Sequence, residues 1–187
     1  HMIMVAYAVM FLHPYYGSND EFTLAAIASG AYGSYTWYFI YLHSAFAWIL
    51  RFFYTLYPAW NWYTLVMYGL IFVSLSAIGC TWIRRSKRIG GIMAVLLVLA
   101  SLSPMYVELQ YTKTAALVTA AGYILVFCSE RKKRHLFGGI VLLVLGSWIR
   151  FQAFGMISIA AFGLWLGLAV KAWKNRDWKT FLVRDCL

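Results

Sequence analysis

The sequence predicts an all-α membrane protein, folded as a single polytopic transmembrane domain over residues 1–187. Of its 187 residues, 63% are hydrophobic and only 12% are charged, whereas soluble domains are nearer half apolar and about a quarter charged. Apolar runs alternate with short basic clusters, as in proteins whose loops flank membrane spans. We therefore expect about six transmembrane helices, with two short juxtamembrane helices in the first outer loop.

The positive charge fits a membrane surface better than nucleic acid. The net charge is +10, but 13 of the 16 Lys and Arg residues lie in three clusters, at residues 84–88, 131–134 and 171–184. These clusters occupy alternate loops of the predicted topology, so the positive-inside rule places them in the cytoplasm. We expect membrane lipids as partners and no nucleic acid, with the first large loop, about residues 14–61, on the extracytoplasmic side.

The first apolar run, from Ile3 to Leu12, has ten residues, which is short for a span of about 20. His1 stands before Met2, and the other end stops abruptly in DWKTFLVRDCL. We therefore expect a chain truncated at one or both ends. Five further runs are predicted as spans: Trp62–Ile83, Ile89–Val107, Thr114–Cys128, Leu136–Ile149 and Ala153–Val170.

The stretch from Tyr35 to Tyr57 admits two interpretations. It is apolar enough to span, which would move the preceding loop to the cytoplasm. However, 15 of the 33 residues from 31 to 63 are aromatic, and Trp and Tyr favour the headgroup level. Arg51 lies on a narrow polar stripe and would cost roughly 3 kcal/mol to bury in a spanning helix. An in-plane helix ended by Pro58 is therefore favoured.

Two adjacent carboxylates, Asp20 and Glu21, follow the first apolar run. Ser18 and Glu21 match the capping-box pattern S-x-x-E, and Gly30 is a natural helix stop, so a short helix over residues 19–29 is expected. Its acids could simply cap it. The alternative is catalytic: Asp20 is not needed for a capping box, and a carboxylate at the membrane surface can act as a general base toward a hydroxyl.

Four further residues are candidates for binding substrate. Arg51, Lys113 and Arg150 face outward in this topology, where cations can hold a phosphate. Arg150 is the strongest candidate because it interrupts the apolar pattern of VLGSWIRFQAFG. The alternative is that its side chain snorkels to the lipid headgroups. Lys113 could be an ordinary loop lysine near lipid phosphates. His43 could ligate a metal, but no second ligand stands at helical spacing, which favours a polar-face histidine.

A glycine pair in the last predicted span bears on helix packing. Gly163 and Gly167 form a GxxxG motif, which more often marks close helix packing within a bundle than a dimer face. We therefore expect these glycines to contact another helix of the same chain.

The order of these elements resembles the integral-membrane glycosyltransferases of the GT-C fold. An acidic pair in the first outer loop precedes YLHSAFAWILRFFYTLYPAWNWYTLVMYGL, which is similar to a juxtamembrane helix and the next span of that family. His43 matches a family histidine, although Ser44 and Ala45 replace the prolines that often follow it. LQYTKTAALVTAAGYILV is similar to later spans of bacterial relatives. The resemblance covers residues 3–170 in layout and residues 18–70 in motif.

The resemblance implies an N-terminal module that transfers a sugar from a polyprenyl-phosphate donor to an acceptor outside the cytoplasm, in the cell envelope of a bacterial plasma membrane. Asp20 would be the base, and Arg150 and Lys113 would stabilise the leaving phosphate. No cofactor or metal motif is identified, but a divalent metal at the acidic pair stays open. The alternative is a non-catalytic multi-pass protein: a transport or substrate-binding subunit, or an assembly partner.

Overall fold

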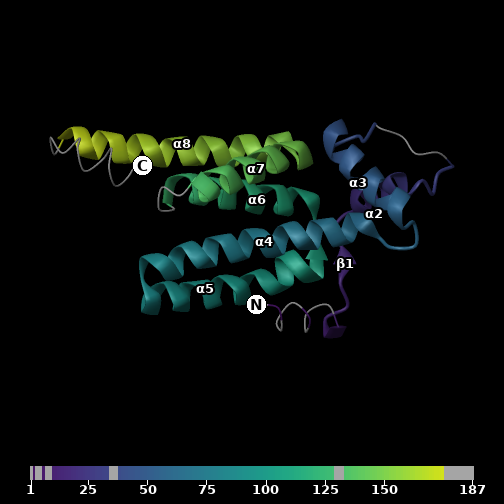
Figure 1. Ribbon diagram of the computed structural model, residues 1–187, viewed down its shortest axis with the longest axis horizontal. Coiled ribbons are helices and arrows are strands. Elements are labelled where there is room, and N and C mark those ends of the chain that lie inside the picture. The colour runs from purple at the N-terminus through teal and green to yellow at the C-terminus, as the bar shows by residue number, and fades with distance from the viewer. Residues whose placement is uncertain (1, 3–5, 7–9, 34–37, 129–132, 175–187) are drawn as a thin grey trace.

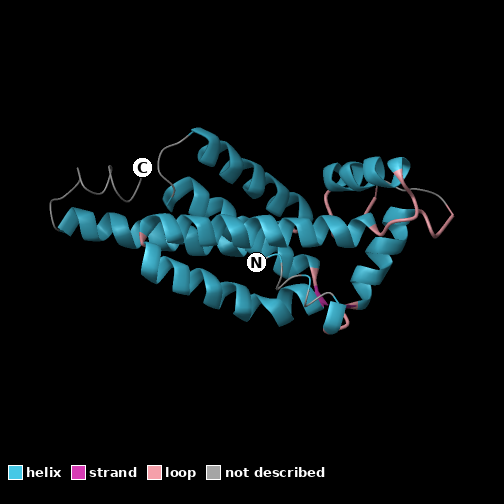
Figure 2. Cartoon of the chain, turned by 60° about the horizontal axis from the view of Figure 1, so that its bottom comes forward, coloured by secondary structure: helices cyan, strands magenta, loops and turns pink. Residues whose placement is uncertain are grey.

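The computed structural model describes residues 2, 6, 10–33, 38–128 and 133–174. Long helices lie lengthwise beside one another, and the shorter elements of the first loop gather at one end, which we call the loop end (Figure 1). The long helices are α4 (Trp62–Arg85), α5 (Lys87–Ser101), α6 (Tyr111–Cys128), α7 (Lys133–Ile149) and α8 (Phe151–Lys174). Helices make up most of the described chain (Figure 2), as the composition predicts.

Three helical segments are long and apolar enough to cross a membrane: Trp62–Arg85, Lys87–Val107 and Phe151–Lys171. The second joins α5 to a π-helix, η1 (Leu102–Val107). α6 and α7 fall on predicted runs but have only 18 and 17 residues. The first predicted run lies largely outside the described residues. The membrane class is therefore supported, whereas the predicted count of six spans is not confirmed.

The first loop contains the two short helices that the sequence predicts. α2 (Asn19–Ser29) ends at Gly30, whose φ of 76° is left-handed, and the N–H groups of Gly30 and Ala31 bond the last carbonyls of the helix. α3 (Ser44–Leu56) begins well after Tyr35 and ends just before Tyr57 and Pro58. Its 13 residues reach about 20 Å, too short for a hydrocarbon core of about 30 Å.

The expected capping box at the start of α2 is wrong. The Ser18 side chain makes no capping hydrogen bond, and its buried hydroxyl oxygen has no partner among the described residues. The Glu21 side chain also turns away from its own helix, toward Tyr63 and Tyr111. Tertiary contacts offer this carboxyl better donors than the local pattern does.

A short parallel ladder, which the sequence analysis did not predict, ties the start of the chain to the middle. β1 (Tyr15–Tyr16) pairs with β2 (Glu108–Leu109), and the Gly17 N–H donates to the Leu109 carbonyl at 2.8 Å. A Cβ on Gly17 would lie 3.0 Å from the Glu108 side chain, so the close approach favours glycine. The ladder places α2 directly beside the start of α6.

Glycines let α6 and α7 pack closely. The predicted contact of Gly163 and Gly167 with another helix of the chain is wrong. A Cβ on Gly139 would lie 2.9 Å from the Gly122 carbonyl oxygen, and one on Gly122 would lie 3.0 Å from the Gly139 carbonyl oxygen. Gly163 and Gly167 instead have open space where a Cβ would project. Their face of α8 therefore packs against no other described part of the chain.

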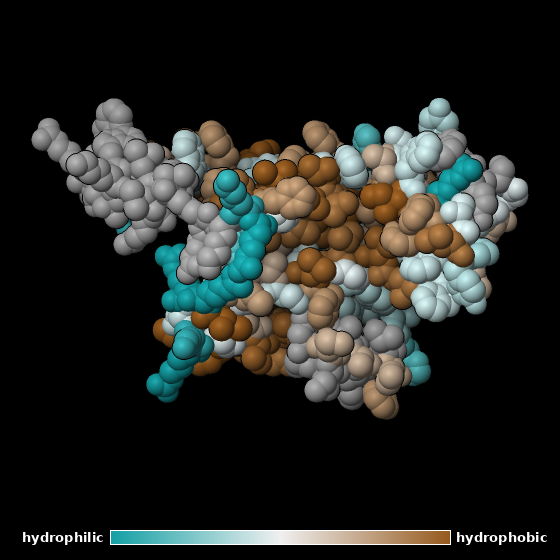
Figure 3. Space-filling view, in the orientation of Figure 1, coloured by the Kyte–Doolittle hydropathy of each residue, from teal (hydrophilic) through white to brown (hydrophobic). Residues whose placement is uncertain are grey.

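Hydrophobic residues cover the middle of the face seen in Figure 3, over the long helices, and hydrophilic residues gather mainly at the end opposite the loop end. That opposite end carries Arg84, Arg85, Lys87 and Arg88 at the α4–α5 turn. Lys133 and Arg134 begin α7 at the same end. The described part of two basic clusters thus lies away from the acidic pair, as the predicted topology requires.

Candidate functional site

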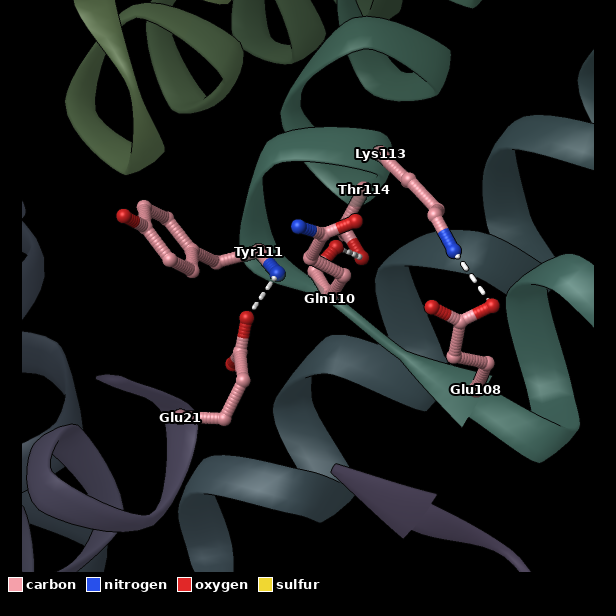
Figure 4. A network of polar contacts seen from close by, with 6 residues as sticks. All are labelled: Glu21, Glu108, Gln110, Tyr111, Lys113 and Thr114. Atoms are coloured by element: carbon pink, nitrogen blue, oxygen red, sulfur yellow. Dashed lines mark hydrogen bonds and ion pairs between the residues drawn. The ribbon is translucent and has the colours of Figure 1, made fainter. Parts of the chain in front are cut away.

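Glu21 joins the first loop to the start of α6 (Figure 4). Its side chain is 0% exposed. One carboxylate oxygen accepts the backbone N–H of Tyr111 at 2.6 Å, and the other accepts the Tyr63 hydroxyl. Tyr111 is the first residue of α6, so Glu21 satisfies an N–H that has no intrahelical acceptor and lies at the positive end of the helix dipole.

The environment of Glu21 favours its neutral form. Burial raises the pKa of its carboxyl above the ordinary value of 4.5, and the charge of Asp20 adds to the rise. The hydrogen bonds from Tyr63 and Tyr111 and the positive charge of Arg150 oppose it. A buried carboxyl with both oxygens engaged is poorly placed to take a proton from a substrate, so the geometry assigns Glu21 an anchoring role.

Arg150 lies on the other side of Tyr111. It stands between α7 and α8, and its Nη1 donates to the Tyr111 hydroxyl and, at 2.8 Å, to the Thr112 hydroxyl. Its guanidinium also lies over the rings of Tyr111 and Tyr41, at 4.8 and 5.7 Å from their centroids. Two hydrogen bonds and two aromatic faces therefore fix its position.

The guanidinium keeps donors for another group. An arginine has five N–H donors, and the bonds to Tyr111 and Thr112 both use Nη1. Among the described residues, Arg150 forms no ion pair with Asp20 or Glu21. A partly exposed cation held this way can accept an anion through Nε and Nη2.

Asp20 is the accessible member of the acidic pair. Its side chain is exposed in the first turn of α2, while the neighbouring Glu21 is buried and fixes the helix in place. Glu21 accepts the Tyr111 N–H, and Arg150 donates to the Tyr111 hydroxyl. The structure therefore brings the buried acid of the pair, Glu21, and the predicted cation to one residue, and it places Asp20 next to Glu21 in the first turn of α2.

Two of the other predicted site residues, His43 and Lys113, have partners of their own. The His43 ring nitrogen Nδ1 accepts the Ala45 N–H at 3.2 Å and so caps α3, and the ring stacks on Trp148. Lys113 forms an ion pair with Glu108 at 2.9 Å, on the side of the α6 start away from the Tyr111 ring (Figure 4). Arg51 is partly exposed on α3. The contacts that join Glu21, Tyr111 and Arg150 include none of these three.

Within the described residues, no group of three or more His, Cys, Asp or Glu side chains could hold a metal ion. The carboxylate donors of the acidic pair also diverge, because Glu21 is buried between Tyr63 and Tyr111 while Asp20 is exposed. The described geometry therefore gives no support to a metal at the pair.

Sequence reasoning missed the residues at the centre of the site. Tyr111 and Thr112 lie in the LQYTKTAA stretch, and Tyr63 is the second residue of α4. A tyrosine at a membrane interface is ordinary, so nothing in the local pattern sets these apart. Comparisons with protein-family models, with curated proteins and with solved structures found no match to this chain.

Proposed function

We propose that this chain is the N-terminal module of a GT-C-type membrane glycosyltransferase. It would transfer a sugar from a polyprenyl-phosphate donor to an acceptor on the extracytoplasmic side. One observation carries the proposal: Glu21 and Arg150 both contact Tyr111, and the exposed Asp20 carboxylate forms no ion pair with Arg150.

The chemistry needs these two charges in different places. The Asp20 carboxylate takes the proton of the acceptor hydroxyl or amine as that group attacks the anomeric carbon of the sugar. The bond from this carbon to the phosphate oxygen breaks, and its electron pair leaves with the phosphate. Arg150 stabilises the negative charge of the departing lipid phosphate through the donors it does not use within the protein. Lys113 is not assigned to the phosphate because Glu108 already pairs with it.

Asp20→Asn and Arg150→Lys in the full-length protein test the proposal. We expect Asp20→Asn to reduce kcat by about 10²- to 10⁴-fold and Arg150→Lys to reduce it by about 10²-fold or more. Glu108→Gln, which removes a carboxylate outside the Tyr111 contacts, serves as the matched control. Sugar transfer retained by folded Asp20→Asn would rule out Asp20 as the base.

A non-catalytic assembly subunit is the second candidate. It is favoured by α8, whose span is only 6% buried and whose GxxxG face is open. Such a face can pack against a helix of another protein. If Asp20→Asn and Arg150→Lys leave transfer unchanged while variants at Gly163 disrupt a complex, this candidate is favoured instead.

A further inference from the structure

The turn between α4 and α5 holds four cations on a tightly packed corner. Only Ser86 separates the last residue of α4 from the first residue of α5, and its N–H donates to the Trp82 carbonyl at 3.0 Å. The two helices approach so closely here that a Cβ on Gly90 would overlap the Trp82 carbonyl. The corner therefore has little freedom to move. Its exposed cations are Arg84, Arg85, Lys87 and Arg88.

A contact between α4 and α7 brings further cations to this corner. Nη1 of Arg84 lies 2.8 Å from Nε2 of His135, near the start of α7. Because a guanidinium carries only donors, Arg84 donates and the imidazole nitrogen accepts. The two residues before His135 are exposed cations as well. Together these side chains form what we call the basic corner: Arg84, Arg85, Lys87, Arg88, Lys133 and Arg134.

The basic corner has no acidic neighbour within the described part of the chain. The described acids are Asp20, Glu21 and Glu108, which all belong to the loop end. Helix dipoles offset only part of the repulsion between the cations. The cations of α4 stand in its last turn, where the dipole stabilises them, whereas those of α5 and α7 stand in first turns, where it does not. An anion bound among these side chains would relieve their mutual repulsion.

Exposed apolar side chains border the basic corner and indicate which anion it binds. Ile83 and Ile89 stand just before and just after the cations of the α4–α5 turn, and they are 43% and 67% exposed. On α7, Phe137 follows His135 by two residues and is 71% exposed. Cations meet phosphates beside apolar side chains at the headgroup level of a bilayer. A soluble phosphate compound has no chain to cover such a border.

We propose that the basic corner binds the headgroup of one anionic phospholipid, shared between the cations of the α4–α5 turn and those at the start of α7. The Arg84–His135 contact carries the inference, because it brings two charged segments that are about 50 positions apart in the sequence to one place. Arginine can hold a phosphate through two parallel hydrogen bonds. The site lies at the end of the bundle opposite Asp20 and is independent of sugar transfer (Figure 1).

Native mass spectrometry of the purified full chain in a neutral detergent tests this inference by counting bound lipids. The probes are dioleoyl phosphatidylglycerol, dioleoyl phosphatidylcholine and inorganic phosphate. We expect one phosphatidylglycerol to bind at least about tenfold more tightly than phosphatidylcholine, since each cation at a membrane surface contributes about fivefold. Inorganic phosphate at millimolar concentration should not displace it. Displacement would show a site for free phosphate and would overturn the lipid assignment.

Variants on both sides of the Arg84–His135 contact test whether the headgroup is shared. Arg84→Gln and Arg134→Gln should each reduce the preference for phosphatidylglycerol by about fivefold. Glutamine keeps a donor for His135, so the thermal midpoint should stay unchanged, and Arg85→Gln is a second variant that leaves the contact intact. Lys171→Gln is the matched control, because it removes an exposed cation of α8 outside the basic corner. It should change the preference by less than about twofold.

Equal binding of the two phospholipids by the original chain would overturn the inference. A loss in Lys171→Gln as large as the other losses would also overturn it, because diffuse attraction to positive charge would then explain the binding. If only the variants of the α4–α5 turn lose the preference, the headgroup is not shared with α7 and the proposed site is wrong. Asp20→Asn should bind phosphatidylglycerol as the original chain does, so this inference and the proposed catalytic role can fail separately.

Discussion

The Glu21 carboxyl holds two helices and a loop in one arrangement because each of its oxygens accepts a different donor. The Tyr111 N–H comes from the start of α6, and the Tyr63 hydroxyl comes from α4. Tyr111 then accepts a hydrogen bond from Arg150 through its own hydroxyl. One buried residue therefore sets the position of the ring on which the cation rests.

Replacing Glu21 by alanine should leave two buried donors without acceptors. We expect this variant to lose about 2 to 5 kcal/mol of unfolding free energy, measured by SDS titration in mixed micelles at mildly acidic pH. Glu21→Gln is the control: its amide oxygen can accept the Tyr111 N–H and its amide nitrogen can donate to Tyr63, so the loss should stay within about 1 kcal/mol. Equal stability of the alanine variant and the original chain would contradict the anchoring role.

The original chain and the Glu21→Gln variant should differ in how their free energy of unfolding depends on pH. Because burial raises the folded-state pKa of Glu21 above 4.5, its contribution to stability is fully present below that pH and is lost as the pH rises through the folded-state pKa. The groups facing it are Tyr63, Tyr111, Asp20 and Arg150. We expect the original chain to lose stability relative to Glu21→Gln as the pH rises above about 4.5. Parallel pH profiles for the two proteins would show that Glu21 does not titrate with folding.

At the scale of elements, the contact between α6 and α7 depends on glycine. Backbone atoms of the two helices approach so closely at Gly122 and Gly139 that a methyl group would meet a carbonyl oxygen. Backbone cannot move aside as a flexible side chain can. Small residues at such crossings allow membrane helices to gain dispersion contacts along their length.

Gly139→Ala should therefore destabilise the pair by about 1 to 3 kcal/mol. Gly138→Ala is the matched control on the same helix, since a Cβ there would make only an ordinary contact with Leu125, at 3.9 Å. The control should be neutral or slightly stabilising, because alanine favours a helix over glycine by about 1 kcal/mol. Thermal unfolding in detergent measures both, and equal midpoints would contradict the packing described for Gly139.

At the scale of the whole molecule, the two ends of the helix bundle carry different sets of charged residues. The described basic residues of the α4–α5 turn and the start of α7 lie opposite the end that carries α2 and α3. The loop end instead combines the acidic pair with Arg150 and the Lys113–Glu108 ion pair. A bundle with this asymmetry has a preferred orientation in a membrane.

Single cysteines at Asn19 and Arg88, in a background without the native cysteines, test that orientation. Both positions are exposed, and the candidate span Trp62–Arg85 lies between them in the chain. We expect an impermeant maleimide to label position 19 from outside intact cells and position 88 only after permeabilisation. Labelling of both positions from the same side would contradict the predicted topology and would mean that a further segment crosses the membrane.

The sequence by itself determined the features that depend on neighbours within a few residues. Hydropathy gave the membrane class, and Gly30 and Pro58 marked where α2 and α3 end, because left-handed backbone and a missing N–H are local properties. Arg150 was found because an ionisable residue stands out within an apolar run. Tertiary structure alone decided the rest. Glu21 meets a donor 90 positions away, β1 pairs with β2, and Gly122 meets Gly139 while Gly163 faces open space. Each outcome depends on which distant groups the packed chain brings within hydrogen-bond or van der Waals distance, and a local pattern carries no record of that.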